Sequence, residues 1–451
     1  MRTFYISLAF LILTASILLP TPSGLGREGM IMLGILMMAA ILWLTEAIPM
    51  AATGLLIILL QPLLGVEEVG KVFSNFGNRA VFFILASFMI AAAMEKYGLH
   101  RRVAVKFLSI FGNSPKTFIF GVMVTGSLLS FIMLSHGVAA LLLPILLNVM
   151  LIVKAVPKES NFGVATMLSL AYGTTVGSWG TLLGGARNPL TIALLEESGY
   201  SISFLEWMKL GIPLVAVMLP TITLIILFLY PPEKTIIREA VRKLKEDARG
   251  KKMGKEEKMV SIILFTTILL WIFFSDSIGI AVIALLAVSA LFILKLIEWE
   301  DVERKVQWGI ILIYGGAITM GKGMESSGAA LWIANGVTSL FHSQYAILLC
   351  IIILTSILTN LMSNTAAVAT MLPISLGIAN QMGISPLAVG MATAMAGGTA
   401  FLFVIATPGM AMAYSSGYLT QKDMLKAGMA AGILSIIMIF LFTIFYWEPL
   451  S

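Results

Sequence analysis

The chain has 451 residues, of which 59% are hydrophobic and only 12% are charged, whereas an ordinary soluble domain is about a quarter charged. Long apolar runs, without amphipathic spacing, indicate helices surrounded by lipid or by one another. This excludes a soluble fold, and also a β-barrel, whose strands would be segments of about 10 residues with strict alternation. The net charge of +6 lies in loops that flank the runs, so it does not indicate nucleic-acid binding.

Apolar runs of this kind must reach about 20 residues to cross a bilayer. Two other stretches, 115–153 and 345–381, are longer but are broken in the middle by small polar residues, and they predict re-entrant hairpins. The sequence therefore predicts an all-α membrane protein of about eleven transmembrane helices plus two re-entrant hairpins. The eleven runs lie near 4–21, 28–47, 50–66, 79–97, 161–184, 209–230, 259–275, 278–297, 308–324, 386–406 and 425–447.

The N-terminal segment 1–27 begins with Arg2 and an apolar run, as a signal peptide does, but no convincing small-residue cleavage site follows. We therefore expect a retained first helix. The single cysteine, Cys350, lies inside an apolar run, so a disulfide within the chain is impossible.

The polar stretch 232–258 carries ten Lys and Arg residues, and basic loops collect on the cytoplasmic side of a membrane. Placing it inside puts the basic loop at His100–Lys106 inside as well, and the acidic loops outside. We therefore expect a cell (inner) membrane protein with a cytoplasmic N-terminus and an extracytoplasmic C-terminus. The spacing of Ile236, Ile237 and Val241 predicts an amphipathic helix on the inner surface.

The two halves share three sequence features in one order, at offsets of 222 to 230 residues. Each half has a Met-Glu-x-x-Gly pattern, then a polar tip followed by proline, then a small-residue break. Five spans separate the equivalents, and this odd number predicts inverted repeats, which are typical of secondary transporters with sites at broken helices. The predicted segments are repeat 1 at 28–231 (hairpin 115–153, broken helix 161–197), a basic linker at 232–258, and repeat 2 at 259–451 (hairpin 345–381, broken helix 386–418).

The second hairpin turns within 359–365, where hydroxyl and amide oxygens without formal charge suit Na⁺. The helix that follows presents free N–H groups and a positive dipole end, which suit a carboxylate. The partner break lies at Ala406–Gly409, where Pro408 cannot continue a helix. The alternative is that these polar residues only cap helices or join them.

Two motifs then carry a resemblance. Trp43–Gly54 (WLTEAIPMAATG) and Pro62–Gly65 resemble the N-terminal signature of the divalent anion/sodium symporter family, which includes the INDY-type dicarboxylate transporters. The resemblance implies a homodimer that moves a dicarboxylate or another divalent anion by an elevator motion, with Na⁺ sites at both hairpin tips. Carried over, it implies Na⁺ ligands at Thr359, Ser363, Asn364 and Ala406, and substrate contacts at Asn364, Thr365, Thr407 and Pro408.

The first hairpin departs from this pattern. Leu134, Ser135 and His136 stand where the second tip has Ser-Asn-Thr, and Ser130 lies opposite Thr359; a shift of one residue gives Ser135-His136-Gly137 instead. Leu134 cannot coordinate Na⁺, so a first sodium site would rest on Ser130, Ser135 and Gly184.

The first break, Gly184–Pro189, contains Arg187 where the family commonly has a proline pair. An ionisable residue at membrane depth is costly and indicates function, and a guanidinium can hold a carboxylate with two hydrogen bonds. One hypothesis is that Arg187, beside Asn188, supplies the substrate-binding charge that other members obtain from bound Na⁺. The alternative is that Arg187 lies at a helix end and extends to the membrane interface.

His136 has three interpretations: a hydrogen-bond partner of the substrate, like its neighbour Ser135, a proton-coupling group, or a packed core histidine. Of these, we favour the contact with the substrate.

Together these features predict a secondary active transporter of di- or tricarboxylates, such as succinate, malate or citrate, or of sulfate. Na⁺ is the expected coupling ion, and no other cofactor is expected. Anion exchange, proton coupling and an arsenite-type ion exporter are the alternatives. An enzyme is disfavoured because nucleotide loops, His-Glu-x-x-His and Gly-x-Ser-x-Gly are missing from the sequence, and a channel would require symmetric pore rings. The expected partners are a small anion, Na⁺, lipid and a second copy of the chain, not nucleic acid.

Overall fold

The computed structural model describes residues 2–112, 114–233, 237–249, 253–340 and 343–450. Within these ranges the regular structure is helical and no β-strand occurs, which confirms the predicted all-α membrane class. Seven helical stretches of the described chain are long and apolar enough to cross a membrane: Arg27–Thr45, Val69–Lys96, Ser135–Ile152, Phe204–Leu229, Lys255–Ile278, Gln344–Leu361 and Gln421–Leu450. The count of eleven spans stays a prediction.

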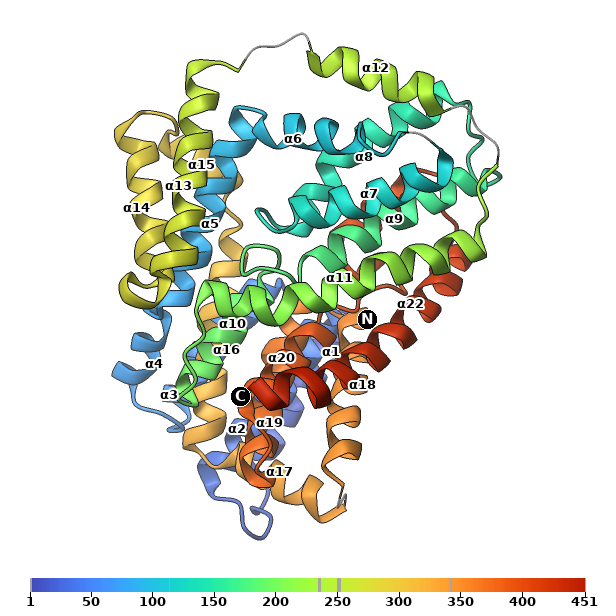
Figure 1. Cartoon of the computed structure of the whole chain (residues 1–451). Helices are drawn as coiled ribbons and strands as arrows, with labels where there is room; N and C mark the ends of the chain where they lie inside the picture. Colours follow the sequence, from blue (N-terminus) through green and yellow to red (C-terminus); the bar gives the residue numbers. More distant parts are fainter. Residues whose placement is uncertain (1, 113, 234–236, 250–252, 341–342, 451) are drawn as a thin grey trace.

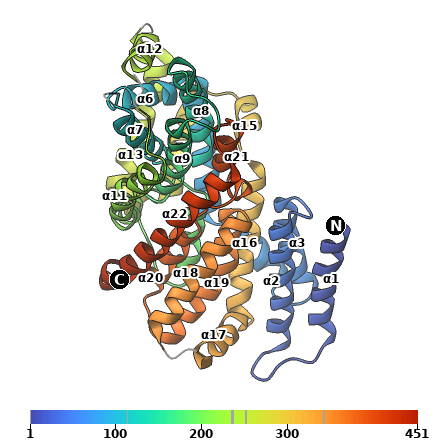
Figure 2. The ribbon, with the colours of Figure 1, turned by 90° about the vertical axis from the view of Figure 1, so that its right-hand side faces the viewer.

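The N-terminal helices form a group at one edge of the molecule (Figure 2). They are α1 (Arg2–Leu18), α2 (Arg27–Thr45) and α3 (Met50–Leu63). The chain reverses between α2 and α3 because Glu46 takes a left-handed conformation, with φ of 47°, and Pro49 then starts the next helix. The short helix α4 (Val69–Phe76) and the longer helix α5 (Arg79–Lys96) lead away from this group.

Glycines let α3 cross α16 (Trp308–Ser326) at very short range. A Cβ on Gly54 would lie 2.6 Å from the Leu312 carbonyl oxygen, and one on Gly316 would lie 2.5 Å from the Gly54 Cα. Small residues of this kind allow helices to pack where the hydrophobic effect supplies little force between them. In Figure 2, α16 stands between the α1–α3 group and the remaining helices of the second half.

The middle of the chain holds a helix pair, an interrupted helix and a long helix. Ser114 and Thr117 form a capping box with Pro115 in the first turn, which fixes the start of the pair. The interrupted helix stops at Gly177, and a Cβ there would lie 2.3 Å from the Ser127 Cα, so the pair packs against it closely. The elements are α6 (Leu99–Leu108), α7 (Pro115–Leu129), α8 (Ser135–Ile152), α9 (Asn161–Gly177), α10 (Arg187–Glu197) and α11 (Phe204–Leu229).

The last third repeats this order of a helix pair, an interrupted helix and a long helix. Its elements are α13 (Lys255–Ile278), α14 (Ile280–Ile293), α15 (Trp299–Lys305), α16, α17 (Ala329–Leu340), α18 (Gln344–Leu361), α19 (Asn364–Met382), α20 (Pro386–Ala396), a 3₁₀ turn (Val404–Ala406), α21 (Pro408–Ser415), α22 (Gln421–Phe442), a π turn (Thr443–Trp447) and a final 3₁₀ turn (Glu448–Leu450). The division into inverted repeats and its membrane sidedness stay predictions.

The basic linker contains α12 (Ile237–Arg249), which lies across one end of the molecule above α6 and α8 (Figure 1). A helix is therefore present where one was predicted, but its environment differs. Its apolar residues Ile237, Ala240, Val241 and Leu244 are buried, and it packs against α6 and α8 instead of presenting this face to lipid. Residues 234–236, including Ile236, and 250–252 lie outside the described residues.

Ion pairs connect α5 and α6 to helices of the second half. Lys96 lies 2.6 Å from Asp301, Lys305 pairs with Glu95, and Arg102 lies 2.6 Å from Glu257. The hydrogen bond from Lys96 lowers the pKa of Asp301 below its usual value. Because these pairs are partly exposed, each contributes about 1 kcal/mol or less to stability.

Candidate functional site

The two interrupted helices meet in the interior at their breaks. The first break runs from Ser178 to Ala186, between α9 and α10, and the second from Gly397 to Thr407, between α20 and α21. The Trp179 indole Nε1 of the first donates to the Gly398 carbonyl of the second at 3.3 Å. Non-helical backbone at membrane depth is tolerated only where protein or a water-filled cavity surrounds it. Here each break lies against the other.

Each hairpin tip is bonded to the break of its own half. In the first half, the Ser135 amide donates to the Gly184 carbonyl at 3.3 Å, and Thr181 Oγ1 donates to the Phe131 carbonyl at 2.7 Å. In the second half, the Asn360 amide nitrogen donates to the Thr399 carbonyl at 3.0 Å, and this bond likewise joins the tip to the break. The tips and the breaks therefore form one polar centre.

At the second tip, three neutral oxygens converge. Thr359 Oγ1 lies 2.6 Å from the Gly397 carbonyl oxygen and 2.8 Å from Asn364 Oδ1. A hydroxyl group carries one proton, so it can donate to only one of these acceptors at a time. A close set of oxygens with more acceptors than protons suits a small hard cation.

The other two expected ligands of this sodium site, Ser363 and Ala406, form hydrogen bonds within the chain, and their role as ligands stays a prediction. Ser363 Oγ accepts from the Ala366 amide at 3.2 Å and so caps α19. Ala406 is buried at the end of the 3₁₀ turn, where its amide donates to the Phe403 carbonyl. Sequence reasoning missed Gly397, although a Gly-Gly pair directly after an apolar run was a visible sign of a break.

The expected substrate contacts of the second half lie at helix starts. Thr365 is half-buried in the first turn of α19. Thr407 Oγ1 accepts from the Met410 amide at 3.1 Å and caps α21, whose first residue, Pro408, is exposed. These positions border the second tip and the second break.

The first half offers buried oxygens that have no partner. The hydroxyl of Ser130 is fully buried without a hydrogen bond, as is Asn188 Oδ1, although the Asn188 amide nitrogen donates to the carbonyls of Ser178 and Thr181 at 2.7 Å. Gly184 leaves no room for a side chain, since a Cβ would lie 2.5 Å from the Ser130 carbonyl oxygen. Unpaired buried oxygens are uncommon and require an explanation, such as water or an ion.

Arg187 is the first residue of α10 and only 2% exposed, so the alternative that it extends to the membrane interface is wrong. Its Nε donates to the Ala394 carbonyl at 2.8 Å, and one terminal nitrogen donates to Ser178 Oγ at 3.0 Å. No acidic side chain of the described residues pairs with it. Its charge is thus buried between the two breaks with only neutral partners, an arrangement that is costly unless an anion joins it.

His136 is half-buried in the first turn of α8, and its Nε2 lies 2.5 Å from the side-chain nitrogen of Gln307. Gln307 precedes α16, so this contact joins the first hairpin tip to a different part of the fold. The interpretation of His136 as a packed core residue does not fit its partial exposure. Beside it, Ser135 is also half-buried.

The chemistry of the centre is that of binding instead of bond breaking. Among the described residues, no group of three or more His, Cys, Asp or Glu side chains could hold a metal ion. The polar atoms are hydroxyls, amides, carbonyls and one buried guanidinium. Such a set can bind an anion and a weakly held monovalent cation.

Comparisons with known proteins show the family to which the chain belongs. A family model described as the sodium:sulfate symporter transmembrane region matches residues 1–451. The chain is 30% identical over 483 residues to the sodium-dependent dicarboxylate transporter SdcS of Staphylococcus saprophyticus, covering 97% of this chain and 90% of that protein. It is 32% identical over 468 residues to the protein of the same name from Staphylococcus aureus strain USA300, covering 95% and 88%.

Among solved structures, the YdaH transporter of Alcanivorax borkumensis has a similar fold, with a TM-score of 0.57 at 13% identity, covering 84% of this chain and 88% of that one. The chain is an integral membrane transporter and not an enzyme. Its apolar helices, its paired hairpins and the two breaks that meet at a polar centre are typical of this class. Because the family model matches its whole length, the chain belongs to the sodium:sulfate symporter family, the divalent anion/sodium symporters of the resemblance.

Proposed function

We propose that this chain is a sodium-coupled secondary transporter of dicarboxylates such as succinate and malate, with tricarboxylates and sulfate as further candidates. The observation that carries the proposal is the buried guanidinium of Arg187, which has neutral partners only and lies where the two breaks meet. Two relatives that match nearly the whole chain are named as sodium-dependent dicarboxylate transporters.

The surroundings of Arg187 favour an anion for a second reason. Four helices begin at the tips or breaks, namely α8, α10, α19 and α21, and a helix N-terminus carries unpaired N–H groups and partial positive charge. In our proposal, one carboxylate of the substrate meets Arg187 and Asn188, and the tips with Ser135, His136, Thr365, Thr407 and Pro408 hold the remainder.

For the coupling ion we propose Na⁺ at the second tip. Thr359, Asn364 and the Gly397 carbonyl supply neutral oxygens, and Ser363 and Ala406 complete the set if the tip rearranges. A cation bound there would add positive charge beside the substrate, so each would strengthen the binding of the other, which is the thermodynamic basis of coupling.

We further propose an elevator motion within a homodimer. The hairpins and broken helices pack on one another, as α21 does on α8 and α9, whereas α1–α3 form a separate group that meets the second half mainly through α16 (Figure 2). A compact body that carries the polar centre can slide against such a group with its binding contacts intact.

Anion exchange is the second candidate, and Arg187 favours it. A fixed guanidinium supplies at all times the charge that a bound Na⁺ would bring only when present. A carrier of this kind needs fewer sodium ions per transport cycle. If it needs none, its binding site crosses the membrane in either direction only with an anion bound, which is exchange. Proton coupling through His136 and an arsenite-type exporter have no comparable observation in their favour.

The test is transport in liposomes that contain the purified protein. Succinate, citrate and sulfate uptake should be measured with and without an inward Na⁺ gradient, and then with each anion trapped inside. We expect Na⁺-stimulated succinate uptake. Uptake that needs internal anion but not Na⁺ would favour exchange, and no movement of any of the three would reject the proposed function.

A further inference from the structure

A cavity of about 1010 Å³ lies outside the polar centre, between the first hairpin and α12. Its lining includes Met133 and Gly137, on either side of Ser135 and His136, and Leu244 of α12. Further along, α8 lines the cavity, and so do the turn between α5 and α6 and the start of α13, with His100, Arg101, Arg102 and Glu257. The cavity therefore connects the first tip to the face of the molecule that α12 covers.

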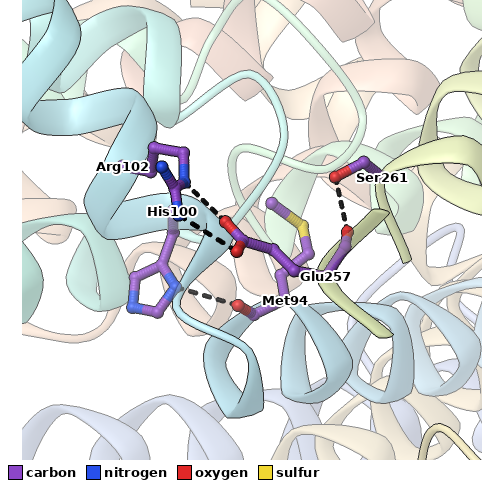
Figure 3. Close-up of polar contacts among 5 residues, drawn as sticks. All are labelled: Met94, His100, Arg102, Glu257 and Ser261. Carbon is purple, nitrogen blue, oxygen red and sulfur yellow. Dashed lines mark hydrogen bonds and ion pairs between the residues drawn. The ribbon is translucent and has the colours of Figure 1, made fainter. Parts of the chain in front are cut away.

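The acidic groups of this wall are already neutralised. Glu257 accepts from Arg102 at 2.6 Å and 3.1 Å through two different nitrogens, as Figure 3 shows. Glu95 pairs with Lys305. His100 Nδ1 lies 3.0 Å from the Met94 carbonyl oxygen, so it donates there and fixes the start of α6 against the end of α5. The carboxylates of the lining thus do not repel an anion as unpaired charges would.

Arg101 is the cation of the lining that remains. It is exposed, lines the cavity, and forms no ion pair or side-chain hydrogen bond with the described residues. Its neighbour Arg102 is held against Glu257, so the two residues that follow His100 have different surroundings. The field of one uncompensated guanidinium in a cavity with low-dielectric walls attracts anions and raises their local concentration.

We infer that this cavity is the route between the α12 face and the first hairpin tip, and that the charge of Arg101 attracts dicarboxylate anions into it. The inference rests on the proposed function, because it concerns how the same anion reaches the same centre. Arg101 acts before binding and does not touch the bound substrate. It therefore affects transport from one side of the membrane only, and its effect weakens as salt screens its charge.

The experiment compares Arg101→Gln with Lys106→Gln, a matched control on the same helix that is exposed but outside the cavity lining. Succinate KM is measured in right-side-out and inside-out vesicles, at about 20 mM and about 300 mM salt. To identify which side α12 occupies, Arg238→Cys in a Cys350→Ser background is labelled with an impermeant maleimide. Arg101→Lys keeps the charge and serves as the rescue variant.

We expect Arg101→Gln to raise KM about threefold to tenfold from the α12 side at low salt, with little change at high salt or from the other side. Arg101→Lys and Lys106→Gln should resemble the wild type. Equal effects on both sides, or no difference between Arg101→Gln and Lys106→Gln, would overturn the inference while leaving the proposed function intact. A wild-type protein that moves no dicarboxylate would instead reject the proposed function, and this inference with it.

Discussion

The two hairpin tips hold equivalent places in the fold but differ in chemistry. At the second tip, Ser363 caps α19, and Asn364 and the Gly397 carbonyl contact Thr359. At the first tip, α8 begins after Leu134 without a side-chain cap, and the buried hydroxyl of Ser130 has no partner. The first break instead contributes the guanidinium of Arg187. The second half thus offers oxygens that can coordinate a mobile cation, whereas the first half carries a fixed positive charge on Arg187.

This difference suggests how related halves can diverge without losing the binding centre. In the proposed function both supply positive charge to the same anion, one through an ion that can leave and the other through a side chain that cannot. The consequence is asymmetric coupling: sodium dependence should reside in the second tip. The following variants test that asymmetry, from the largest expected effect to the smallest.

Arg187→Gln should reduce dicarboxylate uptake about 100-fold or more at substrate concentrations below KM, because removing one partner of a buried charged pair costs several kcal/mol. The unfolding temperature in detergent should stay the same or rise, since the free protein no longer buries an unpaired charge. Initial rates and thermal unfolding are the two measurements.

The control for this variant is Arg304→Gln, which removes an exposed guanidinium that pairs with Glu300 one turn away. Surface pairs of this kind contribute little, so its uptake should be near that of the wild type. Unchanged anion affinity in Arg187→Gln would remove Arg187 from the substrate site. A fall in both uptake and unfolding temperature would indicate a structural role instead.

Thr359→Val should raise the Na⁺ concentration for half-maximal uptake about tenfold, because it removes one oxygen of three and costs about 1 kcal/mol or slightly more. Thr355→Val is a matched control: the residue is buried one turn earlier in α18 and donates only to the Ile351 carbonyl within the helix. Sodium titrations of uptake measure both. Equal shifts in the two variants would show that the change comes from helix packing and not from an ion site.

His136→Gln should raise the substrate KM about threefold to tenfold, as expected for one lost hydrogen bond, and the response of uptake to a pH gradient should survive. Gln307→Ala, which removes the neighbour 2.5 Å from His136 Nε2, should have a weaker effect in the same direction. Loss of the pH response in His136→Gln would establish proton coupling at the first tip in place of substrate contact.

Leu134→Ser gives the first tip the cap that the second tip has, and should stabilise α8 by about 1 kcal/mol. Ser363→Ala should have the opposite effect on α19. Thermal unfolding in detergent measures both. The sodium dependence of Leu134→Ser should not change, because the cap does not restore the missing amide; a stronger sodium dependence would show that the cap alone limits a cation site there.

Much of the fold followed from simple patterns. The length of the apolar runs predicts the helices α5, α11, α13 and α16 within a few residues, because span length is set by bilayer thickness. The sequence also indicated the turn of the second tip, where Thr359 and Asn364 are in contact, while their role as sodium ligands stays a prediction. Short helices such as α6 and α15 were missed, since they lie in polar segments whose helical form depends on caps and tertiary packing.

The contacts within the site were less predictable from the sequence than the helices were. Nothing in the sequence around Ala394 and Gly398 indicates that they lie beside Arg187, since that contact joins segments more than 200 residues apart. The same limit explains α12, whose periodicity indicated an apolar face but not that α6 and α8 cover it. Periodicity identifies a buried face, whereas the identity of its neighbour depends on the whole fold.

The most direct test of the asymmetry is equilibrium binding of radioactive Na⁺ to the purified protein, for the wild type, Asn364→Ala and Ser130→Ala. Asn364 provides an oxygen of the second tip, and Ser130 provides a hydroxyl of the first tip, at the position that lies opposite Thr359 in the second. We predict that Asn364→Ala abolishes saturable Na⁺ binding and that Ser130→Ala leaves it near the wild-type level. Equal losses in the two variants would contradict the account, because they would show a sodium site at each tip.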